Sequence, residues 1–281
     1  GNSNCLEVPW ETIIKKYRID RKDVYLSTIK DQGEDFIDYI KVNLKMFPSE
    51  SQDKFIFTRI DKVFNEIITD IDDNVFREKY TRINLTDDET AQIINENIVA
   101  YHNRYKGYVY HDNFDDQEKK KLLAKYKSTI DDMINVKFKN RNLDPSEIKM
   151  LKDIAAYSIL KDYFPFDSIS GIVITGFWKD EFYPSIVSYD IDGMYENKLR
   201  VKETLNQSVA NNNRSMIYPF AQTDIAALFI EGVSIEYKNS LYEGITEVSE
   251  MFDRAITSHP TISSMSDPGK SRLINSLIAG K

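Results

Sequence analysis

Apolar residues recur at three- and four-residue spacing through most of this chain, but between Ser170 and Arg200 they form short β-branched runs. Spacing of three and four places side chains on one face of an α-helix, whereas β-branched runs pack well on a pleated sheet. The pattern therefore predicts an α+β protein, with an antiparallel sheet layered with helices.

The residues from 170 to 200 predict a three-stranded antiparallel meander. Its first strand contains the apolar run Ile172-Val173-Ile174, its second covers residues 184–189, and its third begins at Lys198. Residues 177–181 are the expected first turn. The pair Asp192-Gly193 predicts the second turn, because glycine adopts positive φ without steric cost.

Six helices are predicted before the meander. Their expected ranges are 9–17, 28–46, 52–82, 86–107, 115–138 and 144–163. Pro9 is the expected first helical residue, since proline is preorganised for that position. Thr86 with Glu89 three residues later forms the capping-box pattern of a helix N-terminus.

After the meander, the pattern predicts a short strand at 216–218 and helices at 221–230, 234–256 and 271–278. The segment between 257 and 270 is rich in serine, proline and aspartate and is expected to be a loop. Low glycine and proline counts, 10 and 8 in 281 residues, agree with long helices and few loops.

Composition excludes several classes of function. The net charge of −8 argues against a general nucleic-acid binder. No run approaches the eighteen apolar residues of a membrane span, so no membrane association is expected. Cys5 is the only cysteine, which rules out a disulfide within the chain and fits a cytoplasmic protein.

Motif searches predict no catalytic, cofactor-binding or metal-binding residue. Asp190-Ile191-Asp192-Gly193 lacks the later oxygen ligands of a calcium loop and is interpreted as a hairpin turn. Gly269-Lys270-Ser271 lacks the upstream glycine and strand of a phosphate-binding loop. His102, His111 and His259 are interpreted as surface or half-buried histidines. The acidic cluster Asp70, Asp72 and Asp73 and the run Lys119-Lys120-Lys121 are interpreted as solvated helix faces.

Two aromatic residues flank the expected first turn of the meander. Trp178 and Tyr183 could anchor a protein partner, as exposed aromatics do at interfaces, or pack on a neighbouring helix. Packing is the preferred interpretation, and both alternatives stay open at this stage.

Three short segments resemble the central hairpin of proteasome-type subunits. They are residues 171–177 (GIVITGF), 182–185 (FYPS) and 189–193 (YDIDG). Residues 218–224 (YPFAQTD) resemble a stretch of bacterial proteins of the same N-terminal-nucleophile hydrolase type. The resemblance covers about a third of the chain and implies an antiparallel sheet between helical layers.

The chain departs from this family in two ways. Residues 47–142 are expected to form a helical insertion, with residues 1–46 and 143–281 as the α+β core. The nucleophile of the family is the first residue of its first strand, and Gly1 has no side chain that could serve. No catalytic residue can therefore be assigned by resemblance.

Two functions remain open from the sequence. The first is a proteasome-like protein that is not expected to be catalytic as this chain stands. The alternative is a non-catalytic scaffold or protein-interaction module that uses the helical insertion. The expected partner is another protein or a second copy of the chain.

Overall fold

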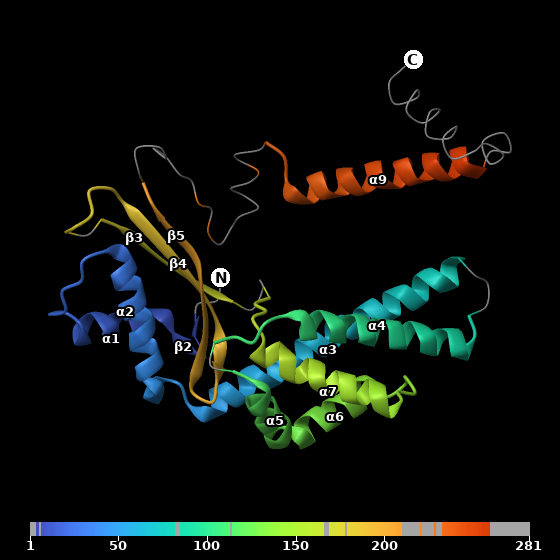
Figure 1. Ribbon diagram of the computed structural model, residues 1–281, viewed down its shortest axis with the longest axis horizontal. Helices are drawn as coiled ribbons and strands as arrows, with labels where there is room; N and C mark the ends of the chain where they lie inside the picture. The colour runs from blue at the N-terminus through green and yellow to red at the C-terminus, as the bar shows by residue number, and fades with distance from the viewer. Residues whose placement is uncertain are drawn as a thin grey trace, which may run out of the picture. The chain divides into compact units, whose positions relative to one another are not determined.

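The computed structural model describes residues 4–5, 7–81, 85–112, 114–165, 169–177, 179–209, 218, 220, 228 and 232–258. The chain divides into two compact units, residues 1–216 and residues 217–281. The first unit is an α+β structure in which a three-stranded antiparallel sheet packs against helices (Figure 1). The α+β fold class is thus confirmed.

The sheet is the predicted meander, in the order β3-β4-β5. Its strands are β3 (Ser170–Gly176), β4 (Ser185–Tyr195) and β5 (Lys198–Ser208). Ile172 lies opposite Tyr189, and Tyr195 lies opposite Lys198. Each strand pairs with the next one in the chain, so the antiparallel arrangement is confirmed.

The predicted turn at Asp192-Gly193 is wrong. Both residues lie inside β4, next to a register shift in its pairing with β5. The turn is formed instead by Glu196 and Asn197, whose φ angles of 48° and 60° match a two-residue hairpin turn. Gly193 is needed for another reason, since the ring of Phe55 occupies the space where a Cβ would lie.

One face of the sheet is covered by α2 (Ile29–Val42), and α1 (Trp10–Asp20) packs against α2 (Figure 1). A two-stranded ladder, β1 (Asn4–Cys5) with β2 (Val8–Pro9), precedes them, so Pro9 lies just before the helix. Gly33 permits close contact, because a Cβ there would lie 2.8 Å from Tyr189 and Val187. These helices and strands share one buried apolar cluster.

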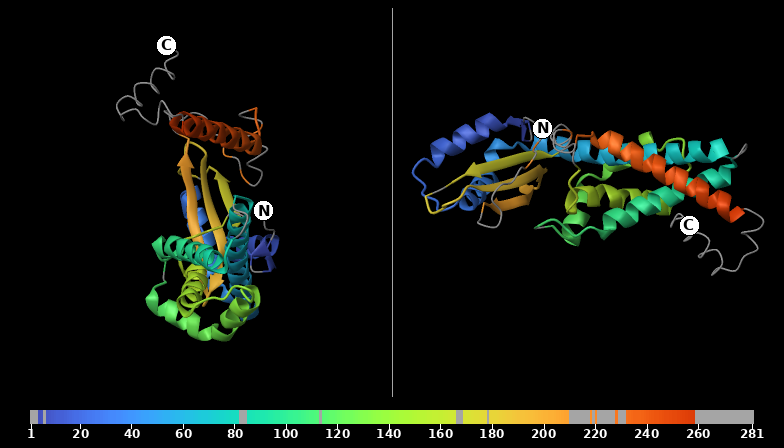
Figure 2. Two further views of the ribbon diagram at one scale, coloured as in Figure 1. Left: turned by 90° about the vertical axis from the view of Figure 1, so that its right-hand side faces the viewer. Right: turned by 90° about the horizontal axis from the view of Figure 1, so that it is seen from above.

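The remaining helices of the first unit form a second buried cluster at the other end of β4 and β5 (Figures 1 and 2). They follow a 3-10 turn at Leu44–Met46. They are α3 (Ser49–Thr81), α4 (Asp87–Gly107), α5 (Asp116–Lys125), α6 (Lys127–Lys137) and α7 (Pro145–Leu160). The Thr86–Glu89 capping box is confirmed, with each side chain bonded to the backbone of the other residue.

The single helix expected over residues 115–138 is instead two helices. Tyr126 separates α5 from α6 with φ −102° and ψ 19°. The apolar face runs through this break, with Leu122 and Ile130 buried on either side. The hydrophobic spacing therefore gave no sign of the interruption.

The second unit contains one long described helix, α9 (Ile235–Ser258), which confirms the helix expected over residues 234–256. Ser234 precedes it and accepts a hydrogen bond from the backbone N–H of Tyr237, 3.1 Å away. The predictions for residues 211–217, 221–227, 259–270 and 271–278 lie outside the described residues. The predicted division at residues 47 and 142 stays a prediction.

None of the helices in the described ranges is long and apolar enough to cross a membrane.

Candidate protein-binding surface

A buried group of charges joins the sheet to the helices of the first unit. The carboxylate of Asp192 on β4 contacts the guanidinium groups of Arg59 on α3 and Arg200 on β5. The side chains of Asp192 and Arg200 are completely buried, and that of Arg59 is nearly so. A carboxylate held by two guanidinium groups cannot serve as a calcium ligand, so the hairpin sequence around Asp192 is not a cation site.

Arg200 also ties β5 to the end of α7. Its guanidinium donates hydrogen bonds to the backbone carbonyls of Ile159, Lys161 and Tyr163, two of them at 3.1 and 3.0 Å. The carbonyls of Ile159 and Lys161 belong to the last turn and C-cap of α7, where backbone carbonyls have few partners within the helix. Burial lowers the pKa of Arg200 below its usual range. No solvent reaches Arg200 or Asp192, so we assign the group a structural role.

His102 and His111, the two histidines in the described part of the chain, lie in separate places and make separate contacts. His111 is buried, accepts a hydrogen bond from the Val201 N–H at 3.3 Å through Nε2, and has Nδ1 3.7 Å from Asp162. Burial, and to a smaller extent Arg200, lower the pKa of His111. With its acceptor nitrogen already used by the backbone, His111 is poorly placed to act as a general base.

His102 lies 3.5 Å from Asp153, which also binds the Lys119 Nζ at 2.7 Å. Lys119 donates to the Tyr157 hydroxyl at 3.0 Å, so this group joins α4, α5 and α7. The interpretation of residues 119–121 as a solvated face therefore fails for Lys119. His259 and residues 269–271 lie outside the described part of the chain.

The acidic cluster at residues 70–73 does not converge on one point. Asp70 accepts a hydrogen bond from the Tyr101 hydroxyl, Asp72 pairs with Arg141, and Asp73 is exposed. Among the described residues, no group of three or more His, Cys, Asp or Glu side chains is placed to hold a metal ion.

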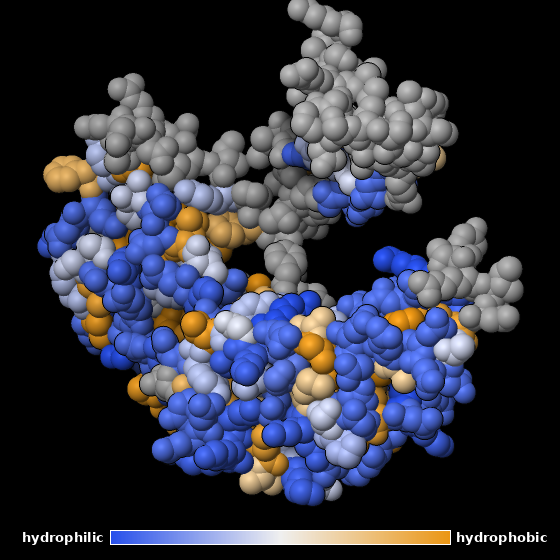
Figure 3. Space-filling model, turned by 45° about the vertical axis from the view of Figure 1, so that its right-hand side comes forward, coloured by the Kyte–Doolittle hydropathy of each residue, from blue (hydrophilic) through white to orange (hydrophobic). Residues whose placement is uncertain are grey.

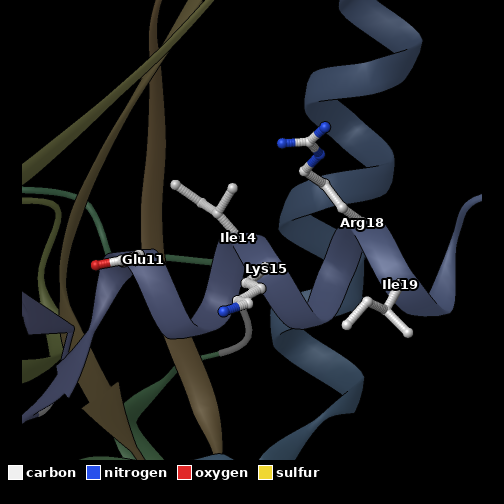
Figure 4. Close-up of a pocket in the computed structure, with 5 residues that line it drawn as sticks. All are labelled: Glu11, Ile14, Lys15, Arg18 and Ile19. Atoms are coloured by element: carbon white, nitrogen blue, oxygen red, sulfur yellow. The ribbon is translucent and has the colours of Figure 1, made fainter.

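Two grooves of the first unit are lined, one by residues of α1 and the other mainly by residues of α3 and α4. A cleft of about 770 Å³ borders α1, and every described residue that lines it belongs to that helix (Figure 4). A second groove, of about 570 Å³, lies along α3 and α4, where Arg104 covers the ring of Tyr101. Three acidic residues line it, and two of them, Asp61 and Asp70, are paired with Lys137 and Tyr101.

Exposed apolar residues in the first unit are mostly scattered. Figure 3 shows hydrophilic residues over most of its visible face, with apolar residues in separate spots. Within residues 47–142, the large exposed apolar side chains are Phe57, Phe76, Val109 and Val136. They lie on different elements or far apart on one helix, and do not form one patch.

The end of the β3–β4 hairpin carries a small aromatic group. Phe182 is almost fully exposed and Tyr183 is half exposed, beside Phe177. The Lys179 Nζ lies 5.4 Å from the ring centre of Tyr25, and the Glu181 carboxylate accepts from the Ile29 N–H. The loop is thereby fixed to the start of α2. Tyr183 is not buried under a helix, and Trp178 lies outside the described residues.

Among the described elements, α9 exposes the largest number of large apolar side chains. Seven large apolar side chains between residues 237 and 252 are each 51–67% exposed. They are Tyr237, Leu241, Tyr242, Ile245, Val248, Met251 and Phe252. We call this set the α9 face. The sequence predicted the helix but assigned it no role, although the three- and four-residue spacing of these positions was visible.

The opposite side of α9 is acidic. Glu236, Glu243, Glu247 and Glu250 follow one another around that side of the helix, away from Leu241 and Ile245. Contiguous apolar surface rimmed by polar residues marks interaction sites in soluble proteins. The α9 face therefore has the character of an interaction surface.

Comparisons with known proteins returned no match. No family model, curated protein or solved structure matches the chain.

Proposed function

We propose that this chain is a non-catalytic protein-interaction module and that it associates through the α9 face. The observation that carries the proposal is the row of seven apolar side chains, all more than half exposed, along 16 residues of one helix. Leaving such a row in water is unfavourable by roughly 25 cal/mol for each Å² of apolar surface, so covering it drives association.

The first unit supports this proposal through the state of its ionisable groups. Asp192, Arg200, His111 and Lys119 are each engaged by several partners within the fold. Groups held in this way stabilise a structure and are not free to bind a substrate. This part of the chain therefore suits a folded platform that carries an association helix, in the cytoplasm.

A crosslinking experiment in cells tests the proposal. A photoreactive phenylalanine derivative at position 241 lies in the α9 face, and the same group at position 239 lies on the opposite side of the helix. We expect covalent adducts of defined mass from position 241 and few from position 239. Equal yields from the two positions, or no adduct from position 241, would contradict the proposal.

A relation to N-terminal-nucleophile hydrolases is the second candidate. It is favoured by the antiparallel β3–β4–β5 meander, which contains three of the four segments that carry the resemblance in sequence. N-terminal sequencing of the protein from its native source tests it. A mature chain that begins with threonine, serine or cysteine supports the relation, and a mature chain that begins at Gly1 argues against it.

A further inference from the structure

We infer that the α9 face binds the α9 face of a second copy of this chain, with the two helices antiparallel. This inference rests on the proposed function and names its partner. It makes the protein a homodimer held together by a short two-helix coiled coil.

The spacing of the central apolar residues is that of a coiled-coil seam. Leu241, Ile245, Val248 and Phe252 follow one another at intervals of four, three and four residues. This alternation keeps one row of side chains facing a partner helix as the two supercoil. A groove that accepts a single anchor would need no such regular repeat.

The exposed area is close to what a dimer requires. Seven large side chains, each at half to two-thirds of full exposure, present on the order of 700 Å² of surface. A standard interface buries about 800 Å² on each partner. The exposed surface of the α9 face is therefore comparable to the area that each partner buries in a standard interface.

The charges of α9 favour another helix over a lipid surface. Its polar side carries Glu236, Glu243, Glu247 and Glu250. Helices that lie on membranes are usually rich in lysine and arginine on that side. In a pair of α9 helices these carboxylates point away from the seam and remain in water, so the pair brings no two of them together.

Lys238 favours the antiparallel orientation. It lies one heptad before Ile245 and so belongs to the same row. In a parallel pair in register, Lys238 would face Lys238 of the partner subunit, and two ammonium groups in the seam repel each other. In an antiparallel pair the two lysines are at opposite ends, and the helix dipoles are also opposed.

In an antiparallel pair centred between residues 246 and 247, each of the four seam residues lies opposite a seam residue of the partner subunit. Leu241 then faces Phe252 of the partner subunit, and Ile245 faces Val248 of the partner subunit. Each layer combines a larger with a smaller side chain, as close packing of a seam requires. The inferred register therefore predicts that positions 241 and 252 of the two subunits are in contact.

Disulfide trapping of the full chain tests both the partner and the register. In a background where Cys5→Ser removes the only native cysteine, two single-cysteine variants are made, Leu241→Cys and Phe252→Cys. Each is oxidised alone and in an equal mixture, and the products are identified by intact mass. Opposed seam positions bring cysteines within the 4.4–6.8 Å Cα separation that a disulfide needs.

We expect the mixture to give the mixed 241–252 disulfide at least ten times faster than either variant gives its own dimer. A matched control uses Asn239→Cys and Glu250→Cys, which have the same separation of eleven residues on the polar side, and it should give little product. A dominant 241–241 product would overturn the antiparallel register, and no product above the control would overturn pairing of α9.

The outcomes separate this inference from the proposed function. If the seam variants form no disulfide but position 241 still gives face-specific adducts with another protein in cells, the second copy is the wrong partner and the interaction role stands. If position 241 gives no adducts in cells either, both fail.

Discussion

The first unit of this chain buries charged side chains, whereas the second exposes large apolar ones. In the first unit, Asp192 and Arg200 are completely buried where the sheet meets the helices, surrounded by two apolar clusters. In the second unit, α9 exposes more than half of each of seven large apolar side chains. Buried charges that are paired can fix the geometry where two elements meet, and exposed apolar rows are stabilised when a partner covers them. The contrast separates a unit whose charged groups are buried within it from a helix whose large apolar side chains are exposed.

The largest expected effect is at the buried charges. Asp192→Ala leaves Arg59 and Arg200 without their shared carboxylate in the interior, so we expect the free energy of unfolding to fall by about 3–5 kcal/mol. Urea denaturation measures it. The control is Lys41→Ala, which removes the exposed pair with Asp38 and should cost at most about 1 kcal/mol. Equal losses of unfolding free energy in the two variants would contradict the role of the buried charges in holding the sheet to the helices.

Two isoleucines compare the units directly. Ile60 on α3 is fully buried and Ile245 on α9 is 55% exposed. Truncating a buried isoleucine to alanine costs about 2–5 kcal/mol, whereas an exposed one contributes little to the fold of a single chain. We expect Ile60→Ala to lower the urea midpoint strongly and Ile245→Ala to leave the unfolding of the first unit unchanged. A large effect of Ile245→Ala on that transition would mean that α9 is part of the core.

Alanine substitutions at two glycines, one in each unit, should change stability in opposite directions. In Gly193→Ala, the added Cβ meets the ring of Phe55, and overpacking of this kind costs about 1–3 kcal/mol. In Gly244→Ala, nothing lies within 4 Å of the new Cβ, and alanine favours a helix interior by about 1 kcal/mol. Thermal unfolding should show a lower midpoint for the first variant and greater helicity of α9 for the second. A neutral Gly193→Ala would contradict the close contact of β4 with α3.

The smallest effect is a dependence on pH that belongs to the first unit. The folded pKa of His111 is lowered, so below the unfolded value of about 6.5 the unfolded chain binds more protons and stability falls as the pH falls. The groups around the ring are Asp162, Asp112 and Arg200. We expect His111→Gln to flatten the stability profile between about pH 5 and 6.5, and His102→Gln serves as the control. An unchanged slope in His111→Gln would assign the dependence to other groups.

The sequence was sufficient for features set by local spacing. Regular apolar spacing predicted α2, α3, α4, α7 and α9, and the short β-branched runs predicted the order of the three strands. The Thr86–Glu89 capping box was visible because it needs only four consecutive residues. Such signals are contained within one element, so one sequence is enough to recognise them.

Features set by distant contacts were missed. Asp192-Gly193 has the local signature of a turn, but Asp192 binds Arg59, which is 133 residues away, and the strand continues to Tyr195. Lys119 belongs to a charged run and binds Asp153 on another helix. The role of α9 was missed for a related reason, because a spacing pattern identifies an apolar face without showing whether the same chain covers it.

Sedimentation equilibrium of the full chain tests the central claim most directly. The measurement compares the unchanged protein with Ile245→Glu, which places a charge in the α9 face, and Asn239→Glu, which adds the same charge on the polar side. We predict a dimer for the unchanged protein and for Asn239→Glu, and a dissociation constant at least tenfold higher for Ile245→Glu, with the helix content of all three alike. A monomer at every concentration, or an equal loss in both variants, would contradict the account.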